Sequence, residues 1–106
     1  MNNLENFARQ RFDLNRQRLT LKEQQEQRLT VAFNGGLFYV DMTLLSYLQT
    51  EPNSHIYIQD SYGNPIHINR HELLQVCRTR YNEVMNDWHD QYEELKKVRK
   101  VGQLGD

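Results

Sequence analysis

The sequence predicts an α+β fold in which two β-hairpins form a small antiparallel sheet, flanked by an N-terminal helix and a long C-terminal helix. Three observations support this prediction. Residues 1–28 are polar and helix-favouring, residues 29–68 hold two pairs of short apolar segments joined by glycine-containing turns, and residues 70–100 repeat apolar side chains every seven positions. A chain of 106 residues suits one domain. We therefore assign 1–28 to a polar N-terminal helix and 29–106 to the other elements, together making one domain.

The N-terminal segment is expected to be helical because Arg, Lys, Glu and Gln predominate in it. On a helical wheel its apolar residues form two lines about 120° apart. The first line holds Leu4, Ala8, Phe12 and Leu19, and the second holds Phe7, Leu14 and Leu21. Residues 22–28 contain no apolar side chain, so they form either a solvated helix or a helix end followed by a loop. A strand over residues 18–22 ranks second to the helix.

The first hairpin is predicted by a change of period at residue 29. Apolar Leu29, Val31 and Phe33 alternate with smaller residues, and residues 37–40 resume the apolar pattern. Between them, residues 34–36 read Asn-Gly-Gly, which adopt positive φ at little cost, as a tight turn requires. A phosphate-binding loop needs more glycines, a lysine and a following helix, so we prefer the turn.

A short helix and a second hairpin follow. Asp41 is placed as the N-cap of a helix over residues 42–48, which residues 50–53 end. In the second hairpin, pairing Ile58 with Ile66 and Ile56 with Ile68 keeps the isoleucines on one face. The same pairing places Gly63 at the left-handed position of the loop.

The C-terminal helix is predicted over about residues 70–100. Asn69 is its expected N-cap, with Glu72 three residues later. Its repeat of Leu74, Tyr81, Trp88 and Leu95 is typical of a coiled coil.

Large aromatic side chains on one stripe of this long helix predict a protein-binding surface, since aromatic residues dominate interface energies. An equally open alternative is that the stripe packs on the N-terminal helix and the hairpins of the same chain. The residues expected to contact a partner are Tyr81, Val84, Met85, Trp88, Tyr92, Leu95, Phe7 and Phe12.

Several histidines and carboxylates are candidates for metal ligands or catalytic groups. Residues 71–75 read His-Glu-Leu-Leu-Gln, and Gln75 stands where a zinc-protease helix needs its second histidine. His55 and His67 are expected on one face of the second hairpin, without an evident third ligand. The acidic residues of the last helix face no second carboxylate across a cleft, as acid–base catalysis requires. We therefore expect no catalytic residue, no metal and no cofactor.

Composition and charge limit the classes of partner and compartment. Thirteen Lys and Arg against 14 Asp and Glu give a net charge of -1, which ranks nucleic acid behind protein partners despite the basic run at residues 96–100. The one cysteine, Cys77, forms no internal disulfide, which favours a reducing compartment, and we expect a packed thiol rather than a nucleophile there. No signal peptide or membrane span is expected.

The turn over residues 60–65, with its flanking strands and the helix that carries Trp88 and Tyr92, resembles hairpin-then-helix modules in small accessory proteins of tailed bacteriophages. The resemblance covers about residues 55–100 and transfers no catalytic residue. It implies a virion structural or assembly protein, located in the virion or the host cytoplasm, which contacts copies of itself or neighbouring virion proteins. The alternative is a small regulatory adaptor or inhibitor that docks on a host protein.

Overall fold

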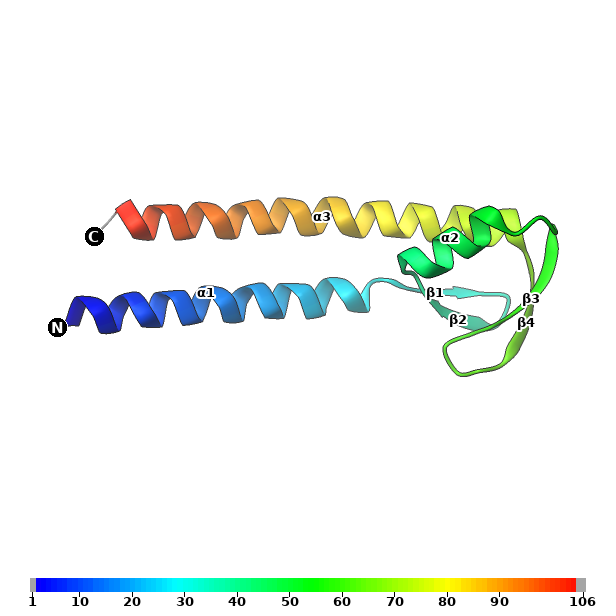
Figure 1. Cartoon of the computed structure of the whole chain (residues 1–106), viewed down its shortest axis with the longest axis horizontal. Coiled ribbons are helices and arrows are strands. Elements are labelled where there is room, and N and C mark those ends of the chain that lie inside the picture. Colours follow the sequence, from blue (N-terminus) through cyan, green and yellow to red (C-terminus); the bar gives the residue numbers. More distant parts are fainter. Residues whose placement is uncertain (1, 105–106) are drawn as a thin grey trace. The chain divides into compact units, whose positions relative to one another are not determined.

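The computed structural model describes the backbone of residues 2–104 and the side-chain surroundings of residues 4–97. Its elements, in order, are α1 (Asn2–Gln27), β1 (Thr30–Phe33), β2 (Gly36–Tyr39), α2 (Met42–Thr50), β3 (His55–Gln59), β4 (Pro65–Asn69) and α3 (Arg70–Leu104) (Figure 1). The predicted α+β class is confirmed. The chain divides into two compact units: unit 1 joins the chain up to Gln25 with the chain from Asn86, and unit 2 is Glu26–Met85.

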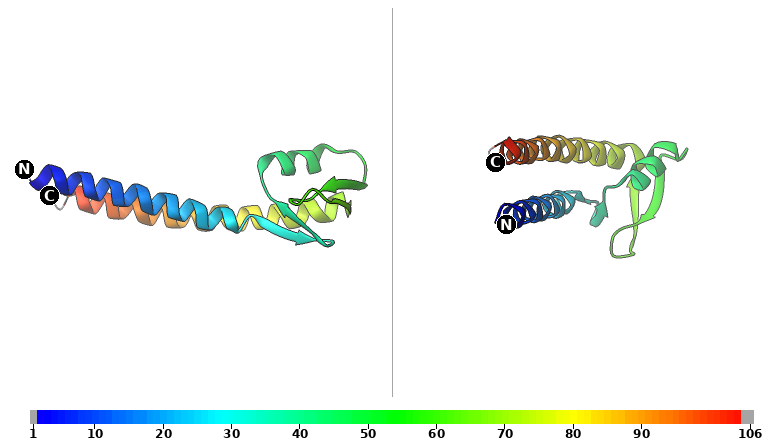
Figure 2. Two further views of the ribbon diagram at one scale, coloured as in Figure 1. Left: turned by 90° about the horizontal axis from the view of Figure 1, so that it is seen from below. Right: turned by 60° about the vertical axis from the view of Figure 1, so that its left-hand side comes forward.

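Unit 1 is a pair of helices. The α1 helix runs antiparallel beside the C-terminal part of α3, as two views show (Figures 1 and 2). Helix α1 continues through residues 22–27, and Gln25 is buried there, so this stretch is neither a loop nor fully solvated. The strand considered for residues 18–22 does not form, because the polar, straight-chain residues on both sides favour one continuous helix.

The first hairpin has the predicted tight turn. Asn34 and Gly35 occupy its two loop positions with φ of 49° and 82°, which fits the left-handed conformation that a two-residue hairpin turn needs. Phe33 pairs with Gly36, so Gly36 is already part of β2. A Cβ atom at Gly36 would lie 2.8 Å from Cγ1 of Ile66, which explains why the strand begins with glycine.

Helix α2 begins at the predicted cap and extends two residues past the predicted end, to Thr50. A carboxylate oxygen of Asp41 accepts a hydrogen bond from the Leu44 N–H at 2.8 Å. The buried side chains of this helix are Leu45 and Leu48, which belong to the core of unit 2.

The second hairpin has the predicted register, with Ile56 opposite Ile68 and Ile58 opposite Ile66. Gly63 has a φ of 79°, as its loop position requires. The isoleucine face of this hairpin packs against the core, whereas His55 and His67 are exposed on the other face.

The hairpins form two separate two-stranded sheets, which corrects the expectation of a single small sheet. The reason lies at the turn that follows β3. The Leu37 N–H on the outer edge of β2 donates to Oδ2 of Asp60 at 3.1 Å, and the Leu37 carbonyl accepts from the Ser61 N–H at 2.7 Å. A side chain and a turn therefore occupy the edge positions that a continuing ladder of strand hydrogen bonds would need.

Asp60 also organises its own turn. Its Oδ1 accepts hydrogen bonds from the N–H groups of Tyr62 and Asn64, both at 3.0 Å. Asp60 is only 9 % exposed. Because it also binds Leu37, its carboxylate accepts hydrogen bonds from backbone N–H groups of both hairpins. The three N–H donors hold its pKa below the usual value, with the Asn64 bond the strongest cause, although burial acts in the opposite direction.

The core of unit 2 lies among the hairpins, α2 and the first half of α3. Asn69 caps α3 as predicted, because its side-chain oxygen accepts from the Glu72 N–H at 3.1 Å. Two arginines fix the same helix to the chain around it: Arg70 donates to the Leu48 carbonyl at 2.6 Å, and Arg80 donates to the Arg28 carbonyl at 2.9 Å. The buried core side chains are Leu29, Val31, Phe38, Val40, Leu45, Leu48, Ile68, Leu73, Leu74, Cys77 and Val84.

Candidate functional site

The predicted partner-binding residues fall into three environments, and the first is the core of unit 2. Val84 is completely buried there, so it is not available to a partner in this conformation. Tyr81 and Met85 are partly buried and pack against the same core. This part of the predicted stripe therefore makes contacts within the chain.

The second environment is the α3 part of unit 1, where Trp88, Tyr92 and Leu95 are half-buried. The Arg18 guanidinium of α1 lies 5.5 Å from the centre of the Tyr92 ring, and the Lys96 ammonium lies 5.1 Å from it. Both distances suit a cation–π interaction. The Tyr92 ring is thus covered by cations from both helices of the pair.

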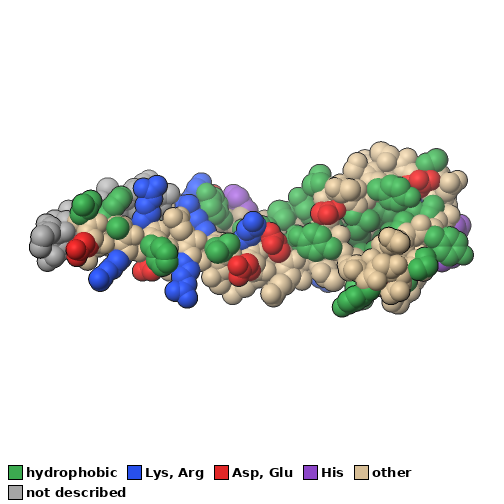
Figure 3. Space-filling model, turned by 60° about the horizontal axis from the view of Figure 1, so that its bottom comes forward, with side chains coloured by type: hydrophobic (Ala, Val, Ile, Leu, Met, Phe, Trp, Pro, Cys, Tyr) green, Lys and Arg blue, Asp and Glu red, His purple; other side chains and the backbone are tan. Residues whose placement is uncertain are grey.

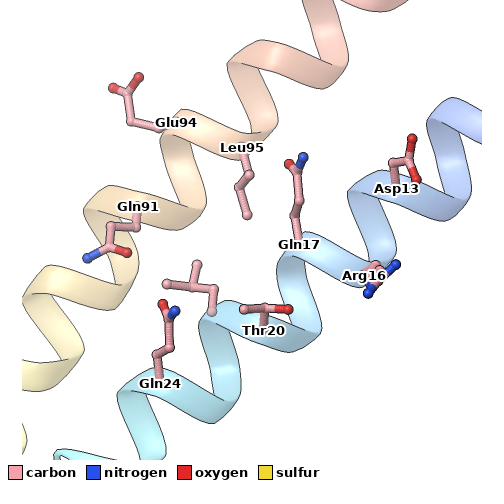
Figure 4. Close-up of a pocket in the computed structure, with 9 residues that line it drawn as sticks. Asp13, Arg16, Gln17, Thr20, Gln24, Gln91, Glu94 and Leu95 are labelled. Atoms are coloured by element: carbon pink, nitrogen blue, oxygen red, sulfur yellow. The ribbon is translucent and has the colours of Figure 1, made fainter.

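A shallow groove of about 520 Å³ runs between these two helices (Figure 4). Gln17 and Gln24 point from α1 towards α3, and Leu95 points from α3 towards α1, whereas Glu94 points away. Leu21 of α1, which is buried, also lines the groove. Polar, charged and apolar side chains all line this groove. Among the described residues, the groove brings together neither a pair of facing carboxylates nor a nucleophile with a base.

The third environment is helix α1, where Phe12 belongs to the first apolar line and Phe7 to the second. The second line becomes more buried along the chain: Phe7 is 47 % exposed, Leu14 is half-buried and Leu21 is buried. The first line faces solvent: Leu4 is 77 %, Phe12 65 % and Leu19 55 % exposed. Figure 3 shows hydrophobic side chains along this helix, separated by lysine and arginine side chains. We call Leu4, Ala8, Phe12 and Leu19 the outer line of α1.

The sequence alone did not identify the outer line of α1 as an exposed surface. The sequence showed two apolar lines on α1 but could not tell which of them packs against α3, and Leu4 and Leu19 were not named as partner-binding residues. Arg18 was also missed, because its contact with Tyr92 joins residues that lie far apart in the chain. The available signal was the position of Arg18 beside the second line on the helical wheel.

The histidine and acidic candidates do not gather at one site, although His89 lies 3.5 Å from Glu93 and 3.7 Å from Asp90. His71 and Glu72 are exposed at the start of α3, and the rings of His55 and His67 stack at 5.7 Å. Among the residues whose side chains the structure describes, no three His, Cys, Asp or Glu side chains come together as a metal site. In the basic run, Lys96 and Lys97 pair with Glu93 and Glu94 at 3.4 and 3.1 Å, and the side chains of Arg99 and Lys100 lie outside the described residues.

Cys77 is expected to resist alkylation in the native protein. Its side chain is completely buried, and this burial raises the pKa of the thiol to about 11, so the reactive thiolate is scarce at pH 7. Iodoacetamide at pH 7 should leave the native protein unmodified over the time in which it labels the urea-unfolded chain completely, as measured by intact mass. Equal labelling rates in the two states would contradict a packed thiol.

Two further findings bear on the function. Within the described part of the chain, no helix has the length and apolar character needed to cross a membrane. Comparison of the chain with protein-family models, curated proteins and solved structures finds no match.

Proposed function

We propose that this protein is a non-enzymatic assembly protein that binds a second copy of itself through the outer line of α1. The single observation that carries this proposal is the exposure of Leu4, Phe12 and Leu19 along one line of a helix whose other line is buried at Leu21. Large apolar side chains exposed along one line of a helix are typical of protein–protein contacts. The resemblance of residues 55–100 to accessory modules of tailed bacteriophages makes a virion or its assembly the context that we propose.

Energetics support self-association through this line. Burying one large apolar side chain contributes about 1.5–3 kcal/mol, and a two-fold contact buries each side chain twice. Two copies of the α1–α3 pair that meet along their outer lines form a four-helix arrangement, which is a common way to bury such surfaces. The polar residues between the apolar ones keep the monomer soluble before it associates.

Substituting Phe12 with glutamate tests the proposal. We expect Phe12→Glu to weaken dimerisation by at least about 100-fold, because the contact loses two apolar side chains and gains two buried charges. Molar mass from light scattering over a wide concentration range measures the effect. Since Phe12 is 65 % exposed, the helix content from circular dichroism should stay unchanged.

Gln10→Glu is the matched control, because it adds the same charge to an exposed position off the outer line. It should leave the dimerisation constant within a few-fold of wild type. A wild-type chain that is monomeric at all concentrations would overturn self-association and favour the adaptor alternative. Equal weakening by both substitutions would show that charge, and not the outer line, determines association.

A further inference from the structure

Unit 2 contains a second surface, a groove of about 550 Å³ formed by β2, α2 and β3. One tyrosine from each element lines it: Tyr39 is 43 %, Tyr47 44 % and Tyr57 72 % exposed. The Tyr57 ring also packs against the His67 ring, with 4.8 Å between their centres, which leaves Tyr39 and Tyr47 as the rings available in the groove. The apolar part of the groove lining consists of Phe38, Leu44 and Ile58, which are buried or half-buried. We call this surface the tyrosine groove. It lies entirely within unit 2 and shares no residue with the outer line of α1.

The charged groups of the tyrosine groove are all acidic. Asp41 and Asp60 are its charged lining residues, and no lysine or arginine lines it. The Asp60 carboxylate already accepts three backbone N–H groups, but Asp41 is exposed and uses one oxygen for the cap of α2. Burial raises the pKa of Tyr39, and the negative charges of Glu26 and Asp41 act in the same direction. An aromatic surface with a negative potential attracts a cation.

The backbone at the groove offers an extended chain one strand-edge position, at Tyr39. In the β1–β2 ladder, Leu37 directs its N–H and carbonyl groups outward, to Asp60 and Ser61. Alternation along the strand directs the N–H and carbonyl groups of Tyr39 to the same side, where the groove lies. An extended peptide can therefore form strand-like hydrogen bonds at Tyr39 while its side chains reach the rings.

We propose that the tyrosine groove binds an arginine-containing extended segment of a partner protein, with the guanidinium stacked on the rings of Tyr39 and Tyr47 and close to Asp41. Arginine fits better than lysine because its planar, weakly hydrated head stacks on aromatic faces. This interaction is separate from self-association through α1, so either can fail without the other.

The first test compares two short peptides on the full-length protein. Acetyl-triarginine-amide and acetyl-tricitrulline-amide have the same shape, but citrulline is uncharged. In ¹H–¹⁵N spectra, triarginine should shift the amides around Tyr39, Asp41, Tyr47 and Tyr57, and should bind at least tenfold more tightly than tricitrulline at low salt. Equal affinity of the two peptides, shifts confined to α1 or α3, or no binding at millimolar peptide would overturn the proposal.

Single substitutions distinguish binding of the peptide in the groove from its nonspecific attraction to acidic residues. Asp41→Asn removes the charge and keeps an efficient N-cap, and Tyr47→Leu removes one ring, so each should weaken triarginine binding about two- to fivefold. Tyr62→Leu is the control, because Tyr62 is 75 % exposed and does not line the groove. If Tyr62→Leu weakens binding as much as Tyr47→Leu, the tyrosine groove is not the site.

Discussion

Replacing Asp60 with asparagine is expected to lower the midpoint of thermal unfolding at pH 7 by roughly 5 °C or more. The Asp60 carboxylate accepts hydrogen bonds from the N–H groups of Leu37, Tyr62 and Asn64. An asparagine side chain has one oxygen and places an NH₂ group against at least one of these donors. At least one N–H at the junction of the hairpins then loses its partner, which is costly where water is excluded.

The effect of this substitution should depend on pH in a defined direction. The folded-state pKa of Asp60 lies below its ordinary value of 3.8, so the ionised carboxylate stabilises the fold. This contribution is present above the unfolded-state pKa and is lost as the pH falls through the lower, folded-state value. Wild type and Asp60→Asn should therefore differ at pH 7 and converge in strongly acidic solution, as followed by circular dichroism.

Asp41→Asn is the matched control for the same chemical change. Asp41 is exposed and makes an N-cap bond that asparagine can also make, so its unfolding midpoint should change little. If the two substitutions lower the midpoint equally, the contacts of Asp60 with both hairpins are not what stabilises unit 2.

Truncating Ile68 is expected to produce the largest loss of stability, about 2–5 kcal/mol in the free energy of unfolding. Ile68 is completely buried in the core of unit 2 and lies opposite Ile56 in the second hairpin. Ile68→Ala removes several buried carbon atoms and leaves a cavity. Urea titration gives the change in free energy, and an unchanged slope would show that the unfolded state is the same.

His67→Ala is the control, because His67 is the neighbouring residue of the same strand and is exposed on the opposite face. His67→Ala should lower the free energy of unfolding by well under half as much as Ile68→Ala does. A similar cost for both variants would indicate that the strand itself, and not the buried isoleucine, determines the loss.

The same titration tests whether the chain is one domain. The only tryptophan, Trp88, lies in unit 1, whereas Ile68 lies in unit 2. If tryptophan fluorescence and the amide signals of the hairpins lose their native values at one urea concentration in Ile68→Ala, the two units unfold together, as predicted. Separate midpoints would show two independent domains.

Local features of the fold were predictable because short-range chemistry determines them. Asn34 and Gly35 accept positive φ, the isoleucine alternation sets the register of the second hairpin, and Asp41 and Asn69 stand where helix caps belong. Each of these depends on residues within a few positions along the chain, or on one pair of neighbouring strands.

Contacts between elements were not predictable in the same way. The turn at Asp60 was recognised, but its bond to Leu37 joins residues 23 positions apart and depends on how two hairpins meet. The tyrosine groove combines three elements whose separate patterns each looked ordinary. On α1, both apolar lines satisfy the helix period, and only the packing of Leu21 shows which one remains exposed.

The junction at Asp60 also has a kinetic consequence. Each hairpin closes locally and can form in microseconds, whereas the Leu37–Asp60 bond requires both hairpins to be in place. Interactions that form after the rate-limiting step of folding affect mainly the unfolding rate. The Leu37–Asp60 bond should therefore lengthen the lifetime of the native state and leave the speed of folding nearly unchanged.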